Sequence, residues 1–161
     1  MGLRYSFGRV AAAKIAQAGS QLGSASNASA LRELLALGGT LARYIADDGA
    51  LWFEEPGADR YDKVPVLGRN WREALETGAR SDRVLTIHYE SLLPHIGDAS
   101  KYLDLDSVEE TMRAMAVVGM DASHYMERRR VRVWNPETGS GHVVSLPAVT
   151  TERAAVSPSV R

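Results

Sequence analysis

The sequence predicts a small single-domain α+β protein with several helices, a C-terminal β-hairpin and extended arms at both ends. The chain has 161 residues, which is about the length of one domain. Its composition, 45% hydrophobic and 24% charged, is close to that of an average globular protein. Helical and strand patterns follow one another in mixed order through the middle of the chain. We therefore expect a basic arm over residues 1–28, an α+β core over 29–146 and a C-terminal tail over 147–161.

The N-terminal segment carries only basic charges, because the first acidic residue is Glu33. It consists largely of Ala, Gly and Ser, and this offers too little bulky apolar surface for a core of its own. We expect it to dock on a partner as an arm. Aromatic and Arg side chains are common anchors of interfaces, so the predicted partner-binding residues are Arg4, Tyr5, Phe7, Arg9 and Lys14.

Two helices are predicted in the first third of the chain. The first covers residues 9–18 and has a thin apolar face, formed by Val10, Ala13, Ile15 and Ala18. Ser29 is the predicted N-cap of the second, which continues to about residue 46. Gly38 and Gly39 lie inside it, where each costs about 1 kcal/mol relative to Ala. They mark either a kink or a close helix crossing, or a break between two shorter helices.

Residues 50–54 favour a short strand, and residues 55–67 contain the Pro and Gly residues typical of a surface loop. Six carboxylates lie around these segments, at Asp47, Asp48, Glu54, Glu55, Asp59 and Asp62. Their spacing matches no calcium-binding loop, so we predict no metal site. We expect a solvated acidic face that docks onto the basic arm of another subunit, which makes copies of this chain one predicted partner.

A short helix and a strand follow. Asn70, Trp71 and Glu73 resemble a capping box that begins a helix ending near Thr77. Residues 84–89 alternate between apolar and polar side chains, as expected for a strand with one buried face.

The last third of the chain predicts a long helix and a hairpin. Asp106 followed by Glu109 fits a capping box, and Gly119 is the predicted end of the helix. The inward stripe of this helix consists of Val108, Met112, Met115, Ala116 and Met120. Residues 130–134 and 142–146 are β-prone runs joined by turn-forming residues, so we expect a β-hairpin.

The order of strand, helix, helix and hairpin between about residues 83 and 146 resembles a winged helix. This resemblance implies that residues 107–120 occupy the position of the recognition helix and that the hairpin is the wing.

The hairpin also carries the strongest nucleic-acid signal in the chain, formed by Arg128, Arg129, Arg130, Arg132 and Trp134. On a strand, Arg130, Arg132 and Trp134 project from one face, where guanidinium groups can contact phosphates while the indole stacks on a base. The competing interpretation is structural, because Arg side chains also stabilise helix C-termini and stack on Trp.

Several classes of function find no support in the sequence. The chain has no Cys, so disulfides and Cys-ligated zinc are excluded. No apolar run approaches the roughly 20 residues of a membrane span. Its four His lack metal-ligand spacing, and it contains no nucleophile elbow, phosphate loop or dinucleotide fingerprint. We therefore expect no catalytic residues, no metal and no cofactor, and the net charge of -1 restricts any nucleic-acid binding to a local patch.

These observations predict a non-enzymatic structural component of a larger assembly, such as a viral or phage particle, located in the virion or the cytoplasm. Its arms would dock on other subunits, because an arm buries a large area at modest chain length. The alternative is a winged-helix-like nucleic-acid-binding protein that uses the basic hairpin.

Overall fold

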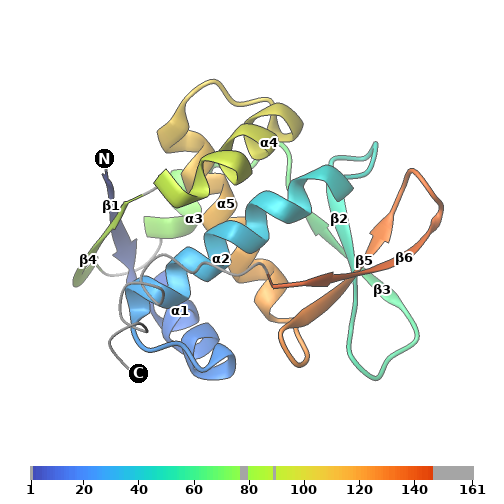
Figure 1. The fold of residues 1–161 in the computed structure, drawn as a ribbon, viewed down its shortest axis with the longest axis horizontal. Helices are drawn as coiled ribbons and strands as arrows, with labels where there is room; N and C mark the ends of the chain where they lie inside the picture. The colour runs from blue at the N-terminus through green and yellow to red at the C-terminus, as the bar shows by residue number, and fades with distance from the viewer. Residues whose placement is uncertain (1, 77–79, 89, 147–161) are drawn as a thin grey trace, which may run out of the picture.

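The computed structural model describes residues 2–76, 80–88 and 90–146, and it confirms the predicted small α+β domain (Figure 1). A group of helices occupies the centre of the molecule, and the larger sheet lies beside it. The elements are β1 (Gly2–Gly8), α1 (Arg9–Leu22), α2 (Asn27–Leu41), the 3-10 helix η1 (Ala42–Tyr44), β2 (Ala50–Glu54), β3 (Tyr61–Pro65), α3 (Trp71–Glu76), β4 (Arg80–His88), the 3-10 helix η2 (Glu90–Leu92), α4 (Leu93–Leu103), α5 (Val108–Ser123), β5 (Arg130–Asn135) and β6 (Ser140–Ser145).

The described strands form two antiparallel sheets. Strands β1 and β4 pair with each other, and the larger sheet has the order β3-β2-β5-β6. The predicted strand over 50–54 and the predicted hairpin are confirmed as β2 and as β5 with β6. The prediction of a loop over 55–67 was wrong in part, because residues 61–65 form β3 and pair along the whole of β2. Only Val64 in β3 is an apolar residue facing the core, so the strand lacks a clear hydrophobic pattern.

The core is built around the crossing of α2 and α5. A Cβ atom on Gly38 would overlap the carbonyl oxygen of Met115, and one on Gly119 would overlap that of Leu34. The two glycines thus let the backbones of the helices touch, and α2 is one continuous helix with a close crossing. Gly119 was wrongly predicted to end its helix, since α5 continues to Ser123.

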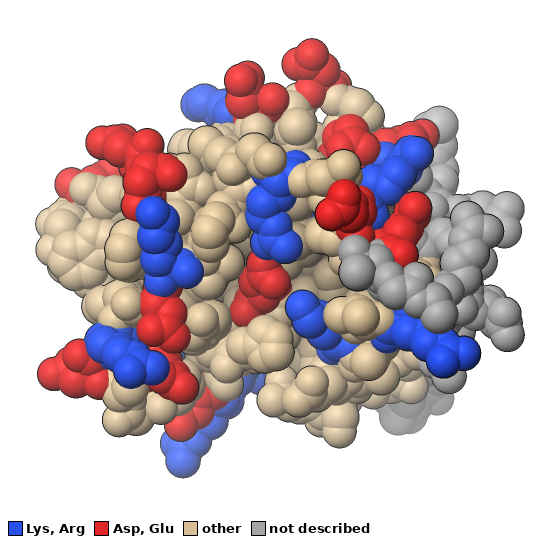
Figure 2. All heavy atoms as spheres, turned by 180° about the vertical axis from the view of Figure 1, so that it is seen from behind, with Lys and Arg blue, Asp and Glu red and all other residues tan. Residues whose placement is uncertain are grey.

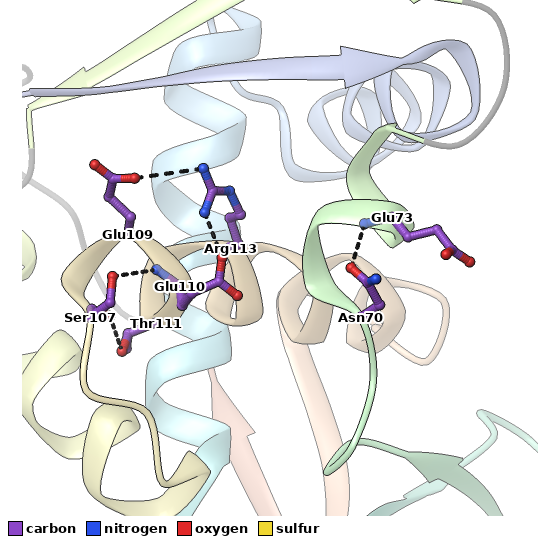
Figure 3. A network of polar contacts seen from close by, with 7 residues as sticks. All are labelled: Asn70, Glu73, Ser107, Glu109, Glu110, Thr111 and Arg113. Carbon is purple, nitrogen blue, oxygen red and sulfur yellow. Dashed lines mark hydrogen bonds and ion pairs between the residues drawn. The ribbon is translucent and has the colours of Figure 1, made fainter.

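The caps differ from the prediction by a few residues. Ser26, not Ser29, caps α2, and its Oγ accepts a hydrogen bond from the backbone N–H of Ser29 at 3.1 Å. Ser107, not Asp106, caps α5, and Figure 3 shows it beside the ion pairs of the first helical turn. The predicted cap of α3 is confirmed, because Asn70 Oδ1 accepts from the N–H of Glu73 at 3.0 Å (Figure 3).

Ion pairs hold the first turn of α5. Arg113 lies between two acidic side chains of its own helix, with its guanidinium 2.6 Å from a Glu110 oxygen and 3.7 Å from a Glu109 oxygen (Figure 3). The two carboxylates also lie at the positive end of the helix dipole, where negative charge is favourable. Val108, predicted to face inward, is 43% exposed.

The N-terminal segment lies against the domain instead of projecting from it as an arm. Strand β1 pairs with β4, and α1 runs to Leu22, four residues beyond the predicted end. Its small residues explain this packing, because Gly19 brings α1 within van der Waals reach of Ala30 on α2. The buried face of α1 is formed by Ala11, Ile15, Ala18, Gly19 and Leu22, whereas the predicted face residues Val10 and Ala13 are exposed.

The resemblance to a winged helix does not extend to the topology. Strand β4, which precedes the two helices, pairs with β1, whereas the hairpin pairs with β2. The proposed recognition helix, α5, is buried along most of its length and packs on α2, α3 and α4. A helix buried in this way cannot enter a DNA groove, so we correct the winged-helix interpretation.

Candidate binding surface

The four-stranded sheet has one side against the helices and one side toward solvent. Alternation along the strands directs Leu51, Phe53, Val131 and Val133 into the core. The register of Phe53 opposite Val133 then places Trp52 across from Trp134 on the other side. We call that side the outer sheet face, and its principal residues are Trp52, Glu54, Tyr61, Lys63, Arg130, Arg132, Trp134, Gly141 and Val143.

Three aromatic side chains on this face line an open cavity of about 210 Å³. We call it the aromatic slot, and its walls are Ala46, Trp52, Tyr61, Trp134 and Pro136. The rings of Tyr61 and Trp134 meet edge to face, with centroids 5.5 Å apart and planes at 75°. This is a favourable arrangement for aromatic pairs.

Gly141 completes the slot by leaving room for Tyr61. A Cβ atom at Gly141 would overlap the Tyr61 hydroxyl, so the tyrosine crosses from β3 over the face toward β6. Burial raises the pKa of Tyr61, and the nearby Glu54 carboxylate raises it further, against the opposing effect of Arg132. The phenol is therefore neutral at physiological pH and can donate a hydrogen bond.

Next to the slot lies a polar groove of about 200 Å³. Its polar lining residues are Glu54, Tyr125, Glu127, Arg130 and Arg132, with Pro56, Gly57, Val131 and Val143 between them. Arg132 Nε lies 3.2 Å from a Glu54 oxygen, so this pair neutralises itself. Arg130 is exposed, and its side chain has no hydrogen-bond or ion-pair partner among the residues that the structure describes.

A third cation of the outer sheet face, Lys63, lies beside Trp52. Lys63 Nζ lies 3.6 Å from an Asp48 oxygen and 5.9 Å from the centroid of the Trp52 ring. Lys63 therefore already has two partners, Asp48 and Trp52. Arg130 is the cation of this face that has no side-chain partner among the described residues and can meet a ligand.

The five residues of the predicted basic hairpin are divided among three places. Arg130, Arg132 and Trp134 share the outer sheet face, with the spacing expected for a strand. Arg129 instead donates to the carbonyl oxygen of Leu22 at 3.0 Å and pairs with Glu33 at 2.9 Å. Arg128 is exposed at the turn before β5 and, like Arg129, has a positive φ.

The predicted residues of the N-terminal arm are also spread out. Phe7 is 1% exposed and belongs to the core of its own chain. Arg9 is exposed at the start of α1, and Lys14 is half-buried further along it. The backbone of β1 places Arg4 opposite Thr86 and Tyr5 opposite Leu85.

Trp52, Tyr61 and Lys63 were missed as site residues. The local signal for this site consisted of two aromatic residues, Trp52 in β2 and Tyr61 at the start of β3. It indicates a shared surface only once the two segments are known to be paired strands. Their importance depends on a sheet in which residues about 80 positions apart lie side by side.

The residues that the structure describes include no group of three or more His, Cys, Asp or Glu side chains placed to hold a metal ion. None of their helices has the length and apolar character needed to cross a bilayer. Searches for similar proteins found no matching family model, no matching curated protein and no matching solved structure.

Proposed function

We propose that this chain is a non-enzymatic binding component of a larger protein assembly, and that the outer sheet face is its contact surface. The observation that carries the proposal is the convergence of Trp52, Tyr61 and Trp134 on one solvent-facing side of the sheet. Trp, Tyr and Arg are the residues that most often dominate the energy of protein interfaces. The viral or phage setting stays a prediction from the sequence.

The arrangement of charges supports a protein partner. The slot is apolar at its centre, and ion pairs at Lys63–Asp48 and Arg132–Glu54 surround it. Stable interfaces have this anatomy, with an apolar core and a polar rim that excludes water.

The docking surface differs from the one first expected. Phe7 is one of the two aromatic anchors proposed for the N-terminal arm, and it fills the protein's own core instead. An anchor that is buried in its own domain cannot also insert into a neighbour without unfolding that region. We therefore assign the contact to the sheet.

A single-stranded nucleic acid is the second candidate partner, because Arg130, Arg132 and Trp134 lie on one strand face. The indole could stack on a base there while the guanidinium groups contact phosphates. The carboxylates of Glu54 and Glu127 line the same groove, however, and would repel consecutive phosphates. Acidic and basic side chains are also interspersed on the side of the molecule seen in Figure 2. The electrostatics of the surface thus favour a protein.

The test is site-specific photocrosslinking in the cells or particles that produce the chain. A photoreactive amino acid replaces Lys63 on the outer sheet face and, as a matched control, Arg72 on the exposed side of α3. We expect protein adducts from position 63 and none, or different ones, from position 72. Nucleic-acid adducts at position 63, or no adduct there, would overturn the proposal.

A further inference from the structure

We propose that the aromatic slot binds a proline-containing extended segment of the partner protein, and that Arg130 pairs with an acidic side chain of the same segment. This inference rests on the proposed function and names the chemistry of the partner.

The shape and lining of the slot suit a proline ring. Trp52, Tyr61 and Trp134 present aromatic surface in an open apolar cavity. Proline-rich segments dock in aromatic-lined grooves because the polyproline helix is already extended and loses little entropy on binding. The backbone carbonyls of such a segment have no internal partners, and the neutral hydroxyl of Tyr61, which lies over Gly141 on the same face, is a donor for them.

The groove beside the slot offers one cation to a partner. Arg132 is paired with Glu54, and Glu127 adds a second carboxylate, so the four charged groups of the lining already sum to zero. Within them, Arg130 is the cation without an ion-pair partner among the described residues, so one carboxylate can pair with it directly. A chain of phosphates would bring several negative charges toward Glu54 and Glu127, whereas a peptide can bring one.

The geometry of β5 sets the spacing between the two contacts. Trp134 and Arg130 lie four positions apart on the same face of the strand, which is about 13 Å at roughly 3.3 Å per residue. A polyproline helix rises about 3.1 Å per residue, so the acidic residue should lie about four positions from the proline. This separation is a specific property of the sheet and defines the recognised motif.

The experiment is selection of a displayed random peptide library on the immobilised full chain. We expect enrichment of peptides with Pro and, about four positions away, Asp or Glu. The enriched peptide is then titrated into the protein, and binding is followed by the tryptophan fluorescence of the protein. Trp134→Ala should weaken binding about thirtyfold, as expected for an aromatic hot spot.

Two further variants separate the contacts. Arg130→Gln should weaken binding about fivefold and remove the preference for Asp or Glu while the preference for Pro remains. Ala46→Gln places a larger side chain in the wall of the slot and should weaken binding without removing an aromatic residue. Circular dichroism verifies that each variant is folded. Tyr102→Ala on α4 and Arg72→Gln on α3 are matched controls on other exposed surfaces and should bind as the parent protein does.

The proposal is overturned if no peptide is enriched, if the enriched motif lacks Pro, or if folded Trp134→Ala and Ala46→Gln variants bind as well as the parent. Binding of oligothymidylate that depends on Trp134 and weakens steeply with salt would assign the slot to a nucleic acid instead. Protein crosslinks at position 63 without a proline motif would refute this inference alone and leave the proposed function standing.

Discussion

Arg129 ties the hairpin to the helices through Glu33, with Nη2 2.9 Å from Oε2 across 96 residues of sequence. Glu33 is 8% exposed and also accepts a hydrogen bond from Ser24, so the carboxylate is buried with its partners in place. The second terminal nitrogen of the guanidinium, Nη1, donates to the carbonyl oxygen of Leu22, the last residue of α1. Such terminal carbonyls lack partners within the helix. Arg129 thus acts as a structural cap for α1.

We predict that Arg129→Gln destabilises the fold by about 1–2 kcal/mol. The reason is that the buried Glu33 carboxylate would lose its cationic partner, although the partial exposure of Arg129 lets water compensate in part. Urea denaturation measures the change. Arg128→Gln is a matched control, because Arg128 is the neighbouring residue, is exposed and also has a positive φ. Equal losses from both variants would mean that turn strain, and not the ion pair, determines the stability.

We predict that Gly38→Ala destabilises the protein by about 3 kcal/mol, at the upper end for overpacking. The added methyl group meets the backbone of Met115, which cannot rotate away as a side chain can. Gly97→Ala is the control, since Gly97 also lies in a helix but has no atom near its Cβ position. That variant should gain up to about 1 kcal/mol from helix propensity. Thermal denaturation compares the two, and similar melting temperatures would contradict the close crossing.

Local patterns predicted the elements whose signals are contained in short segments. Strand β2, the cap of α3 at Asn70 and the β5–β6 hairpin all follow from neighbouring residues. The pairing of β1 with β4 joins residues about 80 positions apart, which no local pattern encodes. Burial of α1 was missed because small residues such as Gly19 stabilise by close approach and not by bulk.

The residues of the candidate site were likewise predicted only where a local pattern places them. The shared face of Arg130, Arg132 and Trp134 follows from strand alternation and was predicted. The separation of Arg129 from that face depends on the positive φ of the turn and on Glu33, which a sequence pattern does not reveal.

We predict that the protein loses stability as the pH falls below about 6.5 in part through His95. Burial lowers the pKa of His95, against the opposing effect of Asp98. Because the folded state prefers the neutral imidazole, its contribution is complete above the unfolded pKa and is lost as the pH falls through the lower folded pKa. The ring lies 3.5 Å from the Thr40 hydroxyl at the crossing of α2 and α4.

Urea denaturation at about pH 7.5 and about pH 5 tests this dependence on His95. The loss of stability between the two should be smaller in His95→Gln, which cannot be protonated. His124→Gln is the control, because His124 is exposed at the end of α5. An equal loss in His95→Gln and the parent protein would show that other groups account for the whole pH effect.

We predict that Gly141→Ala rearranges the aromatic slot with little effect on stability. The added methyl group meets the Tyr61 hydroxyl, which is the far end of a side chain that can turn aside. The free energy of unfolding should change by less than about 1 kcal/mol, whereas the near-UV circular dichroism of the Tyr61–Trp134 pair should change clearly. Tyr61→Phe removes the atom in conflict, so the double variant Gly141→Ala/Tyr61→Phe should recover the spectrum of Tyr61→Phe alone. If the double variant keeps the altered spectrum, Gly141 shapes the slot through the backbone of β6 and not through Tyr61.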